Sequence, residues 1–96
     1  MAKVLGGIEL DIITDLTKLP QKQATAMSEI ENTELVGANY EPLIYLGSQC
    51  VRGVNYWFIA KQTLTTADFE EHIVTIAVNE FGGEYEIVKS TIIRVI

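Results

Sequence analysis

The chain has 96 residues, which is enough for one domain with a hydrophobic core and too few for two. Thirteen acidic residues against seven lysines and arginines give a net charge of −6, which argues against nucleic acid as a partner because phosphate binding needs clustered cations. The single cysteine, Cys50, excludes a disulfide within the chain, so packing alone must hold the fold.

The composition also indicates the compartment. No apolar run approaches the length that crosses a membrane, and the first ten residues lack the pattern of a secretory signal. A chain without disulfides suits a reducing environment. We therefore expect a cytoplasmic protein that has no membrane partner.

The first residues predict a tail followed by a short strand. Residues 1–7 have no periodicity and contain the flexible pair Gly6-Gly7, which indicates a mobile N-terminal trunk. Residues 8–13 alternate loosely between apolar and acidic side chains, as expected for a strand with one buried face.

One helix is expected next, over about Leu16 to Val36. Asp15 or Thr17 is its predicted cap, Pro20 is tolerated in its first turn, and Gly37 is a natural stop. Its modest apolar stripe, typical of a helix with one buried face, comprises Ala24, Met27 and Ile30.

The remainder of the chain is rich in β-branched and aromatic residues, which favour strands. Four strands are predicted, over Tyr40–Ser48, Val54–Leu64, His72–Asn79 and Tyr85–Ile96. The breaks between them, Gln49–Gly53, Thr65–Glu71 and Glu80–Glu84, are short, so consecutive strands should pair antiparallel. We expect a single α+β domain over residues 1–96, with one helix packed across a curved antiparallel sheet of four to five strands.

Two loop motifs and the N-terminus carry a family resemblance. The segment Gln49 to Gly53, "QCVRG", fits the Gln-x-Val-x-Gly pattern and, with the strand after it, resembles the first hairpin loop of the cystatins. Val4-Leu5-Gly6-Gly7 is similar to the trunk of secreted cystatins, and its distance from the glutamine is close to that in stefins. Residues 79–84 stand where cystatins have their second hairpin loop. The resemblance covers nearly the whole chain and implies a cystatin-like fold.

The resemblance implies a reversible inhibitor of papain-like cysteine proteases and not an enzyme. In that family the trunk and the two hairpin loops lie in a row and form a wedge that occludes the active-site cleft. Carried over onto this sequence, the expected protease-binding residues are Val4, Leu5, Gly6, Gly7, Gln49, Cys50, Val51, Arg52, Gly53, Phe81 and Gly82.

The chain departs from the family pattern in both loops. Phe81-Gly82-Gly83 replaces the Pro-Trp or Leu-Pro-Gly of relatives, and the two glycines predict a looser second loop and weaker binding. Arg52 stands where a small residue is common, so its long side chain either clashes in the cleft or selects an enzyme with an acidic wall. Trp57, in the strand after the first loop, is expected to pack on the sheet.

The alternative is an interaction module that keeps the fold without inhibiting a protease. Exposed sheet edges favour association of copies, and Val51, a β-branched residue at a turn tip, supplies strain for domain swapping through the first loop. A monomer is the expected state under the leading hypothesis, and a domain-swapped dimer under this one.

Catalytic and metal-binding hypotheses have less support. Cys50 and His72 are the residue types of a Cys/His nucleophile pair, but there is one of each, on different elements, and no orienting residue stands out. Asp68 and Glu70 precede Glu71 and His72, which alternate to opposite faces of a strand. We therefore expect no catalytic residue, no metal and no cofactor.

Overall fold

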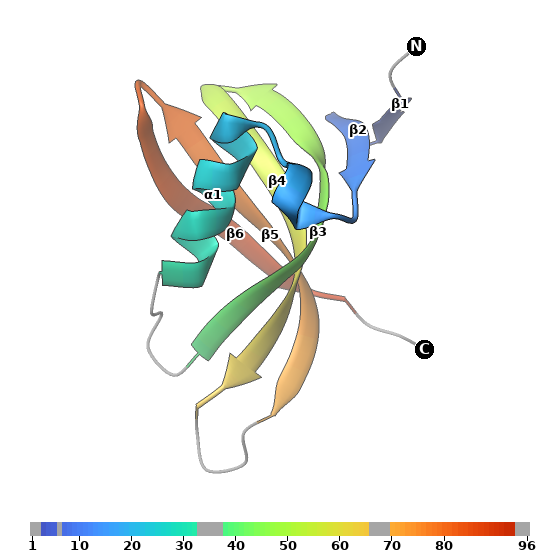
Figure 1. Ribbon diagram of the computed structural model, residues 1–96, viewed down its shortest axis with the longest axis vertical. Helices are drawn as coiled ribbons and strands as arrows, with labels where there is room; N and C mark the ends of the chain where they lie inside the picture. Colours follow the sequence, from blue (N-terminus) through green and yellow to red (C-terminus); the bar gives the residue numbers. More distant parts are fainter. Residues whose placement is uncertain (1–2, 6, 33–37, 66–69, 94–96) are drawn as a thin grey trace.

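The computed structural model describes residues 3–5, 7–32, 38–65 and 70–93. Within these ranges it consists of an antiparallel sheet of six strands with one α-helix on one face (Figure 1). The elements are β1 (Lys3–Leu5), β2 (Ile8–Ile13), the 3-10 helix η1 (Leu16–Lys18), α1 (Gln21–Asn32), β3 (Ala38–Val51), β4 (Gly53–Leu64), β5 (Glu71–Phe81) and β6 (Glu84–Ile92). No helix in the described ranges is long and apolar enough to span a membrane.

The sheet is an open meander in which strands that follow one another in the chain are neighbours, from β1 to β6, and every neighbouring pair is antiparallel. Short connections favour this order because a tight turn joins only antiparallel strands. The predicted α+β architecture is therefore confirmed. The sheet has six strands rather than four to five, and the additional one is β1.

The N-terminal segment differs from the predicted tail. Lys3–Leu5 pair with Ile8–Leu10, with Leu5 opposite Ile8, so this part of the chain turns back along β2 as a hairpin. Val and Leu are compatible with strand conformation, and a Gly-Gly pair between two apolar segments is itself a hairpin signal. Residues 1, 2 and 6 lie outside the described part of the chain.

The predicted helix is divided at Pro20. Asp15 caps η1, since its Oδ1 atom accepts hydrogen bonds from the backbone N–H of Thr17 at 3.1 Å and from its hydroxyl at 2.6 Å. Leu19 is extended, with ψ of 138°, which is the conformation that a following proline imposes. The α-helix starts only after Pro20. Residues 33–37, which include the predicted end and glycine stop, lie outside the description.

The core lies between α1 and one face of the sheet, which we call the inner face. Ala26 and Ile30 of α1 are fully buried there, and the ring of Tyr45 meets that of Phe58 edge-to-face with 5.2 Å between centroids. The complete buried cluster comprises Ala26, Ile30, Tyr45, Tyr56, Phe58, Ala60, Val74, Ile76 and Val78. Burial of these side chains, which come from α1, β3, β4 and β5, fixes the helix on the sheet and orients the ends of the strands.

Candidate functional site

The first hairpin is tighter than the sequence predicts. β3 continues through Gln49 and Cys50 to Val51, which pairs with Gly53, so Arg52 alone forms the turn. The predicted break over Gln49–Gly53 is therefore wrong for all of its residues except Arg52, since β4 begins at Gly53. Val51 occupies an extended position that suits a β-branched side chain, which removes the turn strain expected for it.

The second hairpin is equally short. Phe81 pairs with Glu84, and Gly82-Gly83 between them have φ of 61° and 85°. Two consecutive positive φ values are what a type I′ turn requires, and this turn matches the twist of the flanking strands. The loose second loop expected from the two glycines is thus a tight two-residue turn. Glycine here permits a closed geometry.

The two hairpins touch at one end of the sheet, and we call their contacting turns, Val51–Gly53 and Phe81–Glu84, the hairpin tip (Figure 1). The guanidinium carbon of Arg52 lies 5.2 Å from the centroid of the Phe81 ring, a cation–π arrangement. Gly53 lies so close to β5 that a Cβ atom there would be 2.2 Å from the carbonyl oxygen of Glu80. The cation at the first turn therefore lies over the aromatic ring of the second.

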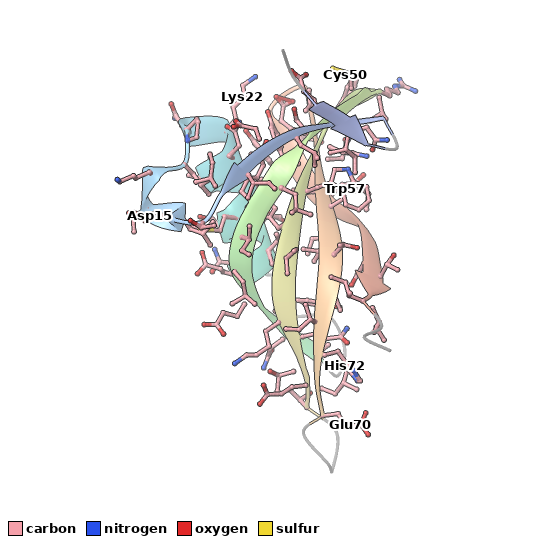
Figure 2. The ribbon with its side chains drawn as sticks, turned by 90° about the vertical axis from the view of Figure 1, so that its right-hand side faces the viewer. Asp15, Lys22, Cys50, Trp57, Glu70 and His72 are labelled. Carbon is pink, nitrogen blue, oxygen red and sulfur yellow. The ribbon has the colours of Figure 1, made fainter. Side chains whose placement is uncertain are left out.

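Behind the tip, three amide side chains cross the sheet, and we call them the amide ladder: Gln49, Asn55 and Asn79. They occupy opposed positions on β3, β4 and β5. Asn79 Nδ2 donates to Asn55 Oδ1 at 2.9 Å, and Asn55 Nδ2 donates to Gln49 Oε1 at 3.4 Å. Trp57 Nε1 donates to the same Gln49 oxygen at 3.2 Å. Since side chains alternate along β4 and the neighbours of Trp57 are in the core, Trp57 and the ladder are on the face away from α1 (Figure 2).

The N-terminal turn reaches the same end of the molecule. Gly7, with φ of 82°, is so near Gln49 that a Cβ atom on it would lie 3.3 Å from Gln49 Nε2. Val4 and Leu5 belong to β1, where they pair with Glu9 and Ile8. The predicted site residues thus come from three segments that are distant in sequence and lie at the same end of the sheet. Gly6 is outside the described residues.

Two large apolar side chains are exposed at the hairpin tip. Val51 keeps 49% of its surface accessible and Phe81 keeps 52%. Scattered apolar residues are ordinary on a protein surface, whereas these two lie at adjacent turns and are candidates for contact with a partner. Cys50 is also exposed and carries a free thiol. Beside Phe81 is a groove of about 310 Å³ lined by Arg52, Asn79, Phe81, Glu84, Tyr85 and Glu86.

An ion pair on the inner face connects α1 to the strand that ends at the tip. Lys22 Nζ lies 3.2 Å from Glu80 Oε1, and the Glu80 side chain is only 13% exposed. The hydrogen bond to Glu80 raises the pKa of Lys22 above its ordinary value. Burial raises the pKa of the neighbouring Tyr56 hydroxyl. Glu80, the residue before Phe81, is thereby linked to Lys22 in the first turn of α1.

The residues considered for catalysis or metal binding do not form a catalytic pair or a metal site in the described part of the chain. Cys50 and His72 lie at opposite ends of the sheet, so they form no Cys/His pair (Figure 2). His72 Nε2 is 3.4 Å from Glu70 Oε2. Within the described ranges no group of three or more His, Cys, Asp and Glu side chains is arranged to hold a metal ion. Asp68 lies outside those ranges.

Sequence reasoning missed Asn55 and Asn79, and it assigned Trp57 to packing without its bond to Gln49. One signal was present. Asn is disfavoured in strands, and here two asparagines stand inside predicted strands at positions that an antiparallel register brings together. Such a pair indicates cross-strand hydrogen bonding between side chains.

No family model, curated protein or solved structure gave a significant match to this chain. A function is therefore inferred from the hairpin tip, the amide ladder and the N-terminal turn.

Proposed function

We propose that this protein has a cystatin-like fold and is a reversible inhibitor of papain-like cysteine proteases, which it blocks by inserting the hairpin tip into the active-site cleft. One observation carries the proposal. Two tight turns, each with an exposed apolar side chain, Val51 and Phe81, touch at one end of the sheet next to the Gly7 turn. The wedge of cystatins also consists of three such segments in a row, and this likeness supports the proposal.

Such an inhibitor acts by filling the active-site cleft, so that substrate cannot enter. A cleft that binds extended peptides has apolar pockets, and exposed valine and phenylalanine side chains suit them. Tight turns cost little ordering entropy on binding and present no extended segment across the catalytic centre. A standard interface buries roughly 1,600 Å² in total, and nanomolar affinity corresponds to about −12 kcal/mol.

The geometry divides the proposed site residues by role. Val51 and Phe81 are the contact residues, and Gly53 permits the close approach of the two hairpins. Gln49 supports the tip from behind, since its Oε1 atom already accepts two hydrogen bonds. β1, the edge strand that contains Val4 and Leu5, is the third part of the proposed contact surface.

Substitution of Val51 tests the proposal. The wild-type chain is titrated against papain with a fluorogenic peptide substrate in reducing buffer, and inhibition is expected at nanomolar to low micromolar concentration. Val51→Asp should weaken inhibition by at least about 3 kcal/mol, more than a hundredfold, because binding would bury an unpaired carboxylate. Val88→Asp is the matched control, since Val88 is 46% exposed against 49% for Val51 and lies on β6 away from the tip.

Two results would contradict the proposal. One is a wild-type chain that leaves papain and other papain-like proteases active at high concentration. The other is a Val51→Asp variant that inhibits as well as Val88→Asp. Circular dichroism of both variants confirms that each is folded before the titrations are compared.

An interaction module without inhibitory activity is the second candidate, and one observation favours it. β6 is an edge strand with exposed Val88 and Ile92, 46% and 50% accessible, and such an edge can pair with another copy. Size-exclusion chromatography across a range of protein concentrations detects that association. A dimer without papain inhibition would support the module, and a monomer that inhibits papain would exclude it.

A further inference from the structure

We propose that Asn79 is a positioning residue: through the amide ladder it fixes the Val51–Gly53 turn against the second hairpin and makes the hairpin tip rigid. Its effect on protease binding rests on the function proposed above, whereas its effect on the tip does not.

Asn79 is placed to use both of its amide hydrogens. Its Nδ2 atom donates to the carbonyl oxygen of Arg52 at 3.0 Å and to Asn55 Oδ1 at 2.9 Å. Arg52 stands between the paired residues Val51 and Gly53, so the strand register gives its carbonyl no cross-strand partner. A side chain from β5 therefore supplies the hydrogen bond that the turn lacks. This bond joins residues 27 positions apart in the chain.

The ladder continues from Asn79 in one direction. Asn79 donates to Asn55, Asn55 donates to Gln49, and the indole of Trp57 also donates to Gln49. Bonds that run in one sense polarise one another, so the series is more stable than its separate members. Gln49 Nε2 in turn lies beside Gly7. The ladder thus links the second hairpin, the first hairpin and the N-terminal turn.

The residue type supports this role. A β-branched residue is the ordinary choice at a central strand position, and Asn there carries a propensity cost. Asn79 and Asn55 are both only partly buried, so the cost is not imposed by the core. The hydrogen bonds to Arg52 and Gln49 offset it. Without the Nδ2 donor, the first turn keeps its Arg52 guanidinium over Phe81 and the close approach of Gly53 to Glu80, but the Arg52 carbonyl loses its hydrogen bond to β5.

Backbone 15N relaxation of the free protein is the direct test. In the wild type, the order parameters of Arg52 and Gly53 should be near 0.85, the value of rigid backbone. In Asn79→Val, which keeps strand propensity and removes the donor, they should fall below about 0.6, while those of α1 stay unchanged. Asn39→Val is the matched control, since Asn39 is an exposed strand residue at the far end of the sheet. If Asn79 only contributed to overall stability, its substitution would lower the free energy of unfolding without lowering the order parameters of Arg52 and Gly53.

Asn79→Ala is measured in parallel, so that a folding defect in one variant leaves the other to decide. If the wild-type chain inhibits papain, both Asn79 variants should raise the inhibition constant about tenfold, because the turn must then be ordered on binding. If the wild type does not inhibit, the proposed function fails and the relaxation data still decide the role of Asn79. Order parameters at Arg52 and Gly53 that match the wild type in both variants would overturn it.

Discussion

Gly53 has the most constrained position among the glycines of the hairpin tip. Its φ is 83°, and a Cβ atom would lie 2.2 Å from the carbonyl oxygen of Glu80, which belongs to the backbone and cannot rotate away. Gly82 has φ of 61° and open space around it. Gly82→Ala should therefore cost only backbone strain, about 1 kcal/mol, whereas Gly53→Ala should cost at least about 3 kcal/mol.

Urea unfolding of both glycine variants measures this difference. Equal losses of stability would mean that the two hairpins are not in the close contact described. The same experiment separates the two uses of glycine at the tip, since Gly82 only permits a turn and Gly53 also permits the approach of a neighbouring strand.

At the scale of residues, the sequence motif identified Gln49 and Gly53 as candidate site positions but did not indicate which neighbours they contact. Gly53 stood out as part of the Gln-x-Val-x-Gly pattern, but its contact with Glu80 depends on how β4 pairs with β5. Gln49 stood out through the same pattern, but the hydrogen bonds that its oxygen accepts from Asn55 and Trp57 depend on how β3 pairs with β4. Such contacts join residues that are distant in the chain, so pattern and propensity do not reveal them.

At the scale of elements, Ile30 anchors α1 to the sheet. It is fully buried among side chains of the inner face, whereas Ile12 in β2 is 60% exposed. Ile30→Ala should lower the free energy of unfolding by about 3 kcal/mol, since it removes buried methyl groups and leaves a cavity. Ile12→Ala should change it by less than about 0.5 kcal/mol. Thermal unfolding of both variants compares the same substitution in two environments, and similar losses would contradict the placement of α1.

The elements were predicted unevenly, for physical reasons. β3 to β6 were recognised because β-branched and aromatic residues fill long segments between short breaks. The helix was predicted too long at its start, because the effect of Pro20 on the residue before it outweighed the helical spacing. β1 was missed because three residues are too few to show alternation. The hairpin turns were shorter than predicted because strand pairing extended to the last residues that the turn geometry allows.

At the scale of the whole molecule, the two ends of the sheet differ in character. One end carries the hairpin tip, with exposed apolar side chains and the amide ladder behind it. Toward the other end, Lys61 bridges Glu41 at 3.2 Å and Glu71 at 3.8 Å across three strands. The core of α1 against the inner face lies between them. One sheet therefore has exposed apolar side chains at one end and ion-paired charged groups toward the other.

The pKa values of four groups in different parts of the molecule are raised above their ordinary values. Burial raises the pKa values of Tyr45 and Tyr56, and hydrogen bonds to Glu80 and Glu41 raise those of Lys22 and Lys61. In each case the folded state keeps its proton to a higher pH than the unfolded state does. Their contributions are thus complete below the ordinary values of 10.0 for tyrosine and 10.5 for lysine, and are lost as pH rises through the folded values.

We therefore expect the urea midpoint to fall as the pH is raised above about 10, and Tyr45→Phe to make that fall shallower. Tyr45 is 1% exposed, so ionising it would place a phenolate in the core, and its hydrogen bonds with Gln23 and Ser48 only partly oppose the burial effect. Phenylalanine has no proton to lose in either state, so the contribution of Tyr45 to the fall of the midpoint should disappear. At pH 8 the variant should be less stable than the wild type, because it lacks the hydrogen bonds to Gln23 and Ser48. Midpoints measured from pH 8 to 11 give both slopes. Parallel curves for wild type and variant would mean that the Tyr45 hydroxyl is open to solvent, against the close packing of β3 under α1.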